Sequence, residues 1–302
     1  MSTLAEIRDG VASGIDLLAV KRNEQLVYEL QNRLNALGLL DPPVDGDFGP
    51  VSHWAWAQFC QLQGEPFTNR LTSRLSGALL RIDAQSLLPL DTSGSDLATR
   101  VARSMEALGY WIARHPDCIN IAYLEGVTLE GKANDNTVNY YNDVRCIFCV
   151  HQGRAILRGA WSATTQPGWH WILNPSNEIR DTVKAAAHIA LGQYKAWCVG
   201  THNAGVAHEA LVQRAKIRVH RDQDRNGQRE ADPIFERADY GINQHHGSNS
   251  TKVGAYSAGC LVANSVAGHK EFMKALKKDP RYRSSNAYRF MTSVLGRGQL
   301  LP

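Results

Sequence analysis

Apolar residues between positions 22 and 85 recur at intervals of three or four, with polar residues between them. This spacing is typical of helices that bury one face. A turn rich in proline and glycine, DPPVDGDFGP at residues 41–50, separates the first such stretch from the second, and residues 72–82 supply a third. The region therefore predicts three short helices around a core of leucine and aromatic side chains, among them Leu26, Leu30, Leu34, Leu37, Trp54 and Phe59.

Beyond residue 95 the pattern changes to a mixture of strands and helices. Stretches rich in β-branched and aromatic residues and broken by glycines predict strands and hairpins. Helical spacing predicts further helices between and after them. The predicted strands cover residues 119–129, 143–165 and 215–222, and the predicted helices cover residues 96–115, 177–197 and 269–279. Because strands dominate the middle, we expect an α+β domain built on a β-sheet.

These patterns divide the chain into four segments. Residues 1–21 form an N-terminal arm, and residues 22–85 form the helical domain. Residues 86–95, rich in proline, serine, threonine and glycine, form a linker. Residues 96–302 form the larger, strand-rich domain.

Composition and charge limit the classes of partner. The chain has 302 residues, of which 43% are hydrophobic and 21% charged, and a net charge of +4. Its basic residues are scattered, which argues against nucleic-acid binding but does not oppose approach to an anionic polymer. No apolar run reaches the roughly 18 residues that span a bilayer. The first 19 residues are interrupted by charges and lack the features of a secretory signal.

The six cysteines are spread along the chain and do not form the dense framework of a small disulfide-rich domain. We expect them to be reduced. Cys146 and Cys149 have the spacing of half a zinc site. Their surroundings predict a strand, which places residues three apart on opposite faces, and no second half-site exists. The structural interpretation of this pair is favoured.

The helical segment resembles the peptidoglycan-binding repeat of cell-wall hydrolases. The resemblance rests on Leu30 and Gln31, on Leu37 and Gly38, and on the Asp-Gly-x-Phe-Gly turn at residues 45–49. It implies that this domain binds peptidoglycan, with Asp45, Phe48 and Trp54 as contact residues. The alternative is a helical module that binds another protein.

A second motif lies near the C-terminal end, where GINQHHG (residues 241–247) precedes YSAGCLV (residues 256–262). Ser-x-Gly-Cys after a histidine, together with the upstream TTQPG turn at residues 164–168, resembles the catalytic segment of L,D-transpeptidases. These are β-rich cysteine enzymes that act on peptidoglycan stem peptides. The resemblance implies an L,D-transpeptidase-like domain with flanking helices.

A cysteine in this setting can perform acyl transfer. Cys260 would attack a peptide carbonyl as a thiolate and form a thioester, with a histidine taking the thiol proton and returning it to the departing amine. We expect His245 to be this base, although the His-Gly pattern also fits His246. Gly259 would allow the tight turn and Ser257 would orient the loop or the imidazole. The expected substrate contacts are His246, Gly247, Trp161 and Pro167.

Two departures from the family pattern bear on the reaction. Ala258 stands where most members carry histidine, and Val262 stands where they carry arginine or asparagine. Substrate binding, and the choice between hydrolysis and transfer, can therefore differ. A non-catalytic wall-binding protein is one alternative. A zinc amidase using His202, His208, His220 and Cys260 is another, although the spacing of these residues matches no metal motif.

The segment HRDQDRNGQREADP (residues 220–233) resembles the start of a calcium loop, with Asp222, Asp224 and Asn226 alternating before Gly227. The twelfth position holds Pro233 instead of the usual glutamate. A polar hairpin turn is the favoured interpretation, and Ca²⁺ binding stays open.

Taken together, the sequence predicts an enzyme that acts on peptidoglycan without a cofactor and hydrolyses stem-peptide bonds. Peptidoglycan is the expected partner, with no nucleic acid and no membrane span. Without a signal peptide, we expect synthesis in the bacterial cytoplasm and action in the periplasm or wall after lysis or injection. A phage endolysin or an injected antibacterial effector fits this route, and its partners would be a holin, an immunity protein or an injection system.

Overall fold

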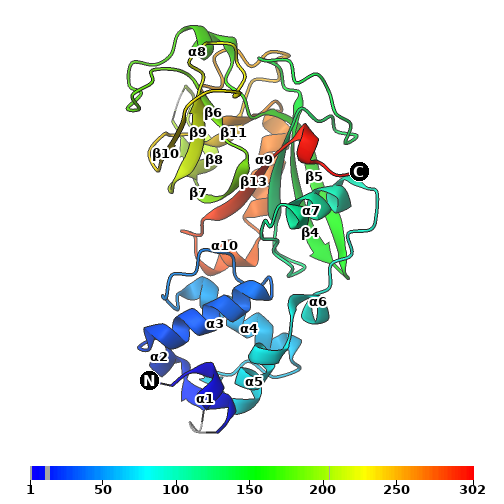
Figure 1. Cartoon of the computed structure of the whole chain (residues 1–302), viewed down its shortest axis with the longest axis vertical. Helices are drawn as coiled ribbons and strands as arrows, with labels where there is room; N and C mark the ends of the chain where they lie inside the picture. The colour runs from blue at the N-terminus through cyan, green and yellow to red at the C-terminus, as the bar shows by residue number, and fades with distance from the viewer. Residues whose placement is uncertain (1, 11–13, 204) are drawn as a thin grey trace.

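The computed structural model describes residues 2–10, 14–203 and 205–302. Helices form the N-terminal part, and a large β-structure with flanking helices forms the rest (Figure 1). The predicted α+β fold is therefore confirmed. Residues 1 and 11–13 of the predicted arm lie outside the described residues, as does residue 204.

The helical domain contains the three predicted helices and several shorter elements. Each main helix starts where its sequence predicts. The Asn23 side chain caps α3 by accepting from Leu26 N, Pro50 opens α4, and Thr72 caps α5. The elements are α1 (Leu4–Arg8), β1 (Ile15–Asp16), α2 (Leu17–Val20), α3 (Glu24–Ala36), α4 (Pro50–Leu62), β2 (Arg70–Leu71), α5 (Ser73–Arg81) and α6 (Ala84–Leu87).

The N-terminal arm is part of this domain. Leu4 and Ile7 of α1 are buried in the same core as α3, α4 and α5. Strand β1 pairs antiparallel with β2, and the Ser76 hydroxyl of α5 donates to the Leu4 carbonyl. The helical domain therefore begins near residue 4 and not at residue 22.

Gln31 fixes the Asp-Gly-x-Phe-Gly turn to α3. Its carboxamide donates to Asp45 Oδ1 at 2.8 Å and accepts from Gly46 N at 2.8 Å. Gly46 has a φ of 73° and lies against the Tyr28 ring, so a side chain at this position would be strained and would clash. Phe48 is buried in the core with 2% exposure. The motif therefore stabilises the turn, and Phe48 anchors the turn in the hydrophobic core.

The strand-rich domain is built on a closed eight-stranded barrel in the order β11-β12-β5-β4-β3-β13-β7-β8. Strands β11 and β12 are parallel, as are β13 and β3, and the other neighbours are antiparallel. The barrel strands are β3 (Asn120–Glu125), β4 (Asp143–His151), β5 (Arg154–Thr164), β7 (Gly192–His202), β8 (His208–Gln213), β11 (Gln244–His246), β12 (Leu261–Ala263) and β13 (Phe290–Gly296).

A small antiparallel sheet and several helices cover the barrel. The sheet has the order β10-β9-β6. Cys146 and Cys149 are both buried in β4, consistent with the structural interpretation of this pair. The covering elements are β6 (Ala187–Ile189), β9 (Ile217–Arg221), β10 (Ile234–Arg237), α7 (Leu97–Ala107), α8 (Trp169–Leu173), α9 (Val266–Leu276), α10 (Pro280–Ser284) and the 3₁₀ helix η1 (Arg297–Gln299).

The predicted helix over residues 177–197 is wrong. Residues 187–189 form β6, and β7 begins at Gly192 and pairs with β8 and β13. The alanines gave this segment helical propensity, but the barrel needs a buried strand here and its pairing overrides that preference. The predicted strands over residues 119–129, 143–165 and 215–222 contain β3, β4 with β5, and β9, as expected.

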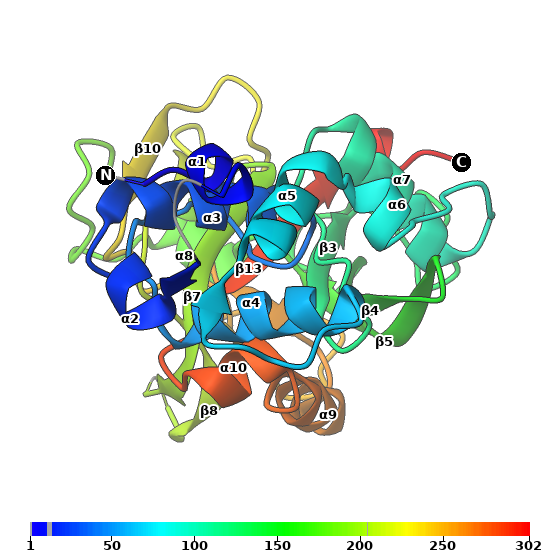
Figure 2. The ribbon, with the colours of Figure 1, turned by 90° about the horizontal axis from the view of Figure 1, so that it is seen from below.

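The two domains are docked through a buried charge. Asp41, which follows α3, is 1% exposed; its carboxylate lies 2.7 Å from Lys195 Nζ and accepts from the Tyr288 hydroxyl at 3.0 Å. Arg281 lies 3.6 Å away. Seen from below, α4 and α10 lie side by side at this interface (Figure 2). The predicted linker thus joins two domains in direct contact.

Candidate functional site

The two motifs of the strand-rich domain meet at one loop. Gly168 N, in the TTQPG turn, donates to the Ser257 carbonyl at 2.8 Å. The backbones approach so closely that a Cβ on Gly168 would lie 2.0 Å from the Gly254 carbonyl oxygen. Pro167 is buried beside this contact. Pro167 therefore supports the loop. Because it is buried, it has no exposed surface through which to make the predicted contact with a substrate.

Ser257 and Gly259 shape the turn that presents Cys260. The Ser257 hydroxyl donates to the Cys260 carbonyl at 2.8 Å and accepts from Gly259 N at 3.2 Å. Gly259 has a φ of 131°, and a Cβ there would lie 2.7 Å from Ala187 of β6. Ser257 therefore orients the loop and not the imidazole. Because its amide is engaged by Ser257, Gly259 is not a free donor for an oxyanion.

The Cys260 thiol is half-buried just before β12. It accepts from Asn243 N at 3.4 Å and donates to the Gly241 carbonyl at 3.7 Å. Burial raises its pKa to about 11. Burial thus favours the neutral thiol, whereas the cysteine mechanism expected from the sequence needs the thiolate.

His245 has the tautomer that a general base needs. Its Nδ1 lies 2.9 Å from the His246 carbonyl oxygen, which can only accept, so Nδ1 carries the proton and Nε2 carries the lone pair. Nε2 is buried and has no hydrogen-bond partner among the described residues. Burial, and then the nearby His202, lowers the pKa of His245 to about 3. The ring is therefore neutral at physiological pH.

In the described part of the chain, no hydrogen bond joins the Cys260 thiol to either candidate ring. His246 directs its Nδ1 to the Gly247 carbonyl at 2.7 Å and packs its ring on His208. Catalytic hydrogen bonds are often long in free enzymes and tighten in the substrate complex. The choice of His245 over His246 as the base therefore stays a prediction.

Four further histidines form a cluster with this base. His245 stacks on His202 with ring centroids 4.0 Å apart, and Asn243 Nδ2 lies 2.9 Å from His202 Nδ1. We call the five the histidine cluster, and its members are His202, His208, His245, His246 and His269. Cys260 and His220 are bound elsewhere, to Gly241 and Asp232 respectively. Among the described residues, no three of His202, His208, His220 and Cys260 have ligand atoms within 4.8 Å of one another.

The predicted calcium segment brings three carboxylates together. Asp222, Asp224 and Asp232 have ligand oxygens within 4.8 Å of one another. Burial raises the pKa of Asp222 to about 6, and Asn226 Nδ2 donates to Asp224. Sequence analysis did not identify Asp232, because this residue does not occupy a ligand position of the calcium-loop pattern. Calcium binding at this turn stays a prediction.

Most of the remaining residues predicted to contact substrate or polymer pack against other parts of the protein. Trp161 packs on Phe272 of α9 and donates to Glu271. A Cβ on Gly247 would lie 2.2 Å from the Tyr141 hydroxyl, so a side chain there would displace the Tyr141 ring. In the helical domain, Trp54 packs edge-on against His115 of the other domain, whereas Asp45 is exposed. Of the three predicted polymer contacts, Asp45 alone is freely accessible.

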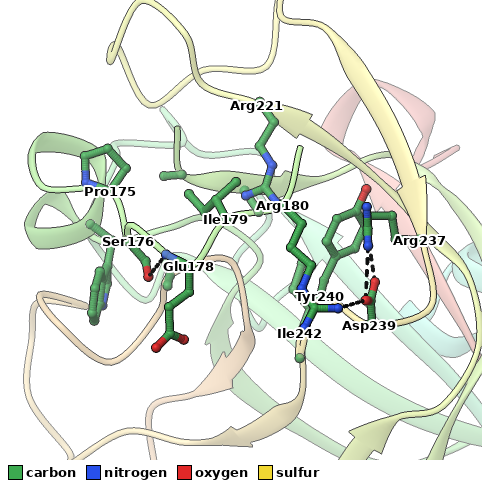
Figure 3. Close-up of a pocket in the computed structure, with 15 residues that line it drawn as sticks. Pro175, Ser176, Glu178, Ile179, Arg180, Arg221, Arg237, Asp239, Tyr240 and Ile242 are labelled. Carbon is green, nitrogen blue, oxygen red and sulfur yellow. Dashed lines mark hydrogen bonds and ion pairs between the residues drawn. The ribbon is translucent and has the colours of Figure 1, made fainter. Parts of the chain in front are cut away.

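A cavity of about 690 Å³ opens beside the Cys260 loop (Figure 3). Gly241, whose carbonyl accepts from the Cys260 thiol, and Ala258 form one part of its wall. We call it the arginine pocket, and its main other lining residues are Trp171, Ile179, Arg180, Arg237, Asp239 and Tyr240. Arg180, Arg237 and Tyr240 belong to no sequence motif, so sequence analysis did not identify them.

The raised pKa of the Cys260 thiol predicts how its rate of alkylation depends on pH. Only the thiolate is nucleophilic, so alkylation by iodoacetamide should accelerate about 10-fold per pH unit from pH 7 to pH 10. Peptide mapping by mass spectrometry at each pH measures this rate. A plateau between pH 5 and pH 8 would instead indicate a resting thiolate–imidazolium pair and contradict the neutral site.

Comparison with known proteins identifies the helical domain. Residues 23–75 match the family model of the peptidoglycan binding domain. The match covers α3, α4 and the start of α5, including the turn held by Gln31. The chain therefore carries a peptidoglycan-binding domain. No curated protein matched the chain.

Two solved structures were also found. A fused Zn-dependent amidase/peptidase/peptidoglycan-binding domain-containing protein from Clostridium acetobutylicum is 13% identical, with 89% of this chain and 94% of that chain covered and a TM-score of 0.24. An L,D-transpeptidase from Xylanimonas cellulosilytica is 14% identical, with 89% and 92% covered and a TM-score of 0.22. Scores of this size do not establish a common fold. Among the described residues, no helix has the length and apolar character to cross a membrane.

Proposed function

We propose that the protein is a peptidoglycan-acting cysteine enzyme that cleaves stem-peptide bonds by acyl transfer to Cys260. One observation carries the proposal: a peptidoglycan-binding domain is docked on a barrel that presents a cysteine loop beside a pocket. Binding the polymer through one domain raises the local concentration of stem peptides at the other. The resemblance of the Cys260 motif to L,D-transpeptidases supplies the reaction class.

The first half of the reaction forms a thioester. The Cys260 thiol leaves the Gly241 carbonyl and turns toward the substrate, and its proton passes to His245 Nε2 as the sulfur attacks the carbonyl carbon. A C–S bond forms and the carbonyl oxygen becomes negative. When this intermediate collapses, the C–N bond breaks and the imidazolium returns the proton to the departing amine.

The second half releases the acyl group. Water attacks the thioester carbonyl while His245 again takes a proton, and the thiol is regenerated. The His246 carbonyl keeps Nδ1 protonated throughout, so that Nε2 remains the proton acceptor. An amine in place of water would give transfer, and we propose hydrolysis as the main branch.

Analysis of the reaction products tests this function. Purified sacculi and defined muropeptides are incubated with the full chain, and the products are identified by mass spectrometry. We expect stem peptides cleaved with the addition of one water, and intact glycan strands. Cleavage of the bond between the glycan and the stem peptide, or of the glycan itself, would reject the proposed reaction.

A further inference from the structure

A second cavity, of about 600 Å³, lies between the two domains. Helix α4 forms one wall, and the linker after α6 together with the turn between β4 and β5 forms the other. Helix α4 lies within the residues that match the peptidoglycan-binding family, so one wall belongs to the polymer-binding domain. We call this cavity the junction pocket, and its main polar lining residues are Gln58, Gln61, Arg114, His115, Asp117 and Gln152.

His115 fixes the orientation of the Gln58 carboxamide. The Asp117 N–H donates to His115 Nδ1 at 3.3 Å, so the proton of the neutral ring is on Nε2. Nε2 lies 2.9 Å from Gln58 Oε1 and donates to it. Burial lowers the pKa of His115, which keeps the ring neutral. The two N–H donors of the Gln58 carboxamide therefore remain for a ligand.

Two further carboxamides line the pocket, one from each domain. Gln61 is exposed on α4, and Gln152 is exposed at the turn between β4 and β5. Neither carboxamide has a hydrogen-bond partner among the described residues. Each supplies two N–H donors and one oxygen acceptor. The pocket thus offers neutral hydrogen-bonding groups from both of its walls.

The junction pocket has no excess positive charge when its imidazoles are neutral. Arg114 bonds Glu106 at 3.0 Å, so that pair cancels. Asp117 is exposed and forms no ion pair among the described residues. His151 is the remaining titratable residue of the lining and is exposed as well. The one uncompensated charge is therefore negative, which disfavours a ligand that carries carboxylates.

We infer that the junction pocket binds N-acetylated amino-sugar residues of a glycan strand. Such a sugar is neutral, presents apolar C–H faces and hydroxyl groups, and carries an acetamido group that can pair with a carboxamide. The pocket matches it with three carboxamides beside apolar surface from Leu62, Pro89 and Pro116. The polymer site is then shared by both domains. The inference goes beyond the proposed function, because binding needs no reaction at Cys260.

The junction pocket and Cys260 lie at opposite ends of β5. This strand begins at Arg154, beside the turn that lines the pocket, and its Thr164 pairs with Val262, two residues after Cys260. Its eleven residues span about 30 Å, whereas an extended tetrapeptide spans at most about 14 Å. A stem peptide on the bound sugar therefore does not reach Cys260. The polymer would be held at one place and cleaved at another.

Binding to the C260A protein tests the inference without any reaction. At pH 8, the full chain is titrated calorimetrically with an N-acetylglucosamine tetrasaccharide and with a stem tetrapeptide, and its cosedimentation with sacculi is measured. We expect the tetrasaccharide to bind and the tetrapeptide not to displace it. Adding Q61A/Q152G should weaken binding of the tetrasaccharide about 10-fold, because two hydrogen bonds are lost. Gln152 has a φ of 49°, which glycine adopts readily, so the turn should be retained.

The control Q25A/Q228A changes one exposed glutamine in each domain outside the pocket and should leave binding unchanged. Absence of tetrasaccharide binding would overturn the inference. So would binding of the tetrapeptide that Q61A/Q152G weakens, which would make the pocket a stem-peptide site. Release from sacculi by D45A but not by Q61A/Q152G would place the polymer on the Asp-Gly-x-Phe-Gly turn instead. Failure of the wild-type protein to cleave peptides would reject the proposed function and leave these binding results unaffected.

Discussion

Cys260→Ala is expected to lower the rate of stem-peptide cleavage at least about 1,000-fold, because the nucleophile of a covalent mechanism has no substitute. The fold should be retained. The thiol is half-buried, and its hydrogen bonds are weak contacts to the Asn243 amide and the Gly241 carbonyl. The measurement is the release of peptide products from defined muropeptides, with the melting temperature recorded in parallel.

Cys198→Ala is the matched control for this change. Cys198 is the other half-buried free cysteine of the described residues, burial raises its pKa, and its thiol donates to the Ala287 carbonyl. It should retain full activity. Equal rates for C260A and the wild-type protein would leave the barrel domain without a cysteine mechanism.

The second large effect concerns the domain interface. Asp41→Asn removes a buried negative charge that faces Lys195 and Arg281 and accepts from Tyr288. Breaking a buried ion pair by removing one partner leaves the other charge uncompensated, and we expect the free energy of unfolding to fall by about 3–5 kcal/mol. Urea denaturation followed by tryptophan fluorescence measures it.

Glu209→Gln provides the comparison for Asp41→Asn. The Glu209–Lys277 pair is exposed, with side chains 43% and 42% accessible, so its loss should change stability little. If Asp41→Asn behaves like Glu209→Gln, the two domains are not held together by this charge. A separate early transition in D41N would show that the helical domain unfolds first when the contact is lost.

Local pattern predicted the elements of the helical domain well. Leucine spacing predicted α3, and the caps at Asn23 and Thr72 mark helix starts that a sequence can show. The peptidoglycan-binding motif was interpreted from the sequence as a polymer-binding motif, but its residues are explained by their role in folding. Gln31 and Phe48 build the turn from inside, so the pattern reports folding and does not by itself identify the polymer-binding surface.

Long-range contacts determine the features of the fold that the local sequence pattern does not predict. The segment predicted as a helix over residues 177–197 contains β6 and the start of β7, because the small sheet and the barrel supply partners for its backbone. Asp41 lies in a turn that reads as a surface loop, and its burial depends on residues about 150 and 240 positions later. No local pattern carries such information.

The part of the candidate site that lies in the Cys260 loop was predictable from the sequence. Ser257, Gly259 and Cys260 are adjacent in sequence, and their hydrogen bonds follow from that. The state of the thiol was not predictable, since it depends on burial by the surrounding loops. The arginine pocket combines segments near residues 180 and 237 that meet only in the folded chain.

Trapping the acyl-enzyme tests the central claim most directly. The full chain is mixed with excess stem tetrapeptide, quenched with acid within the first turnovers, and its intact mass is measured, followed by peptide mapping. A covalent adduct with the mass of the acyl fragment on Cys260, labile to hydroxylamine as a thioester is, is the result we predict. Continued product formation with no adduct on Cys260, and with the same rate in C260A, would contradict it.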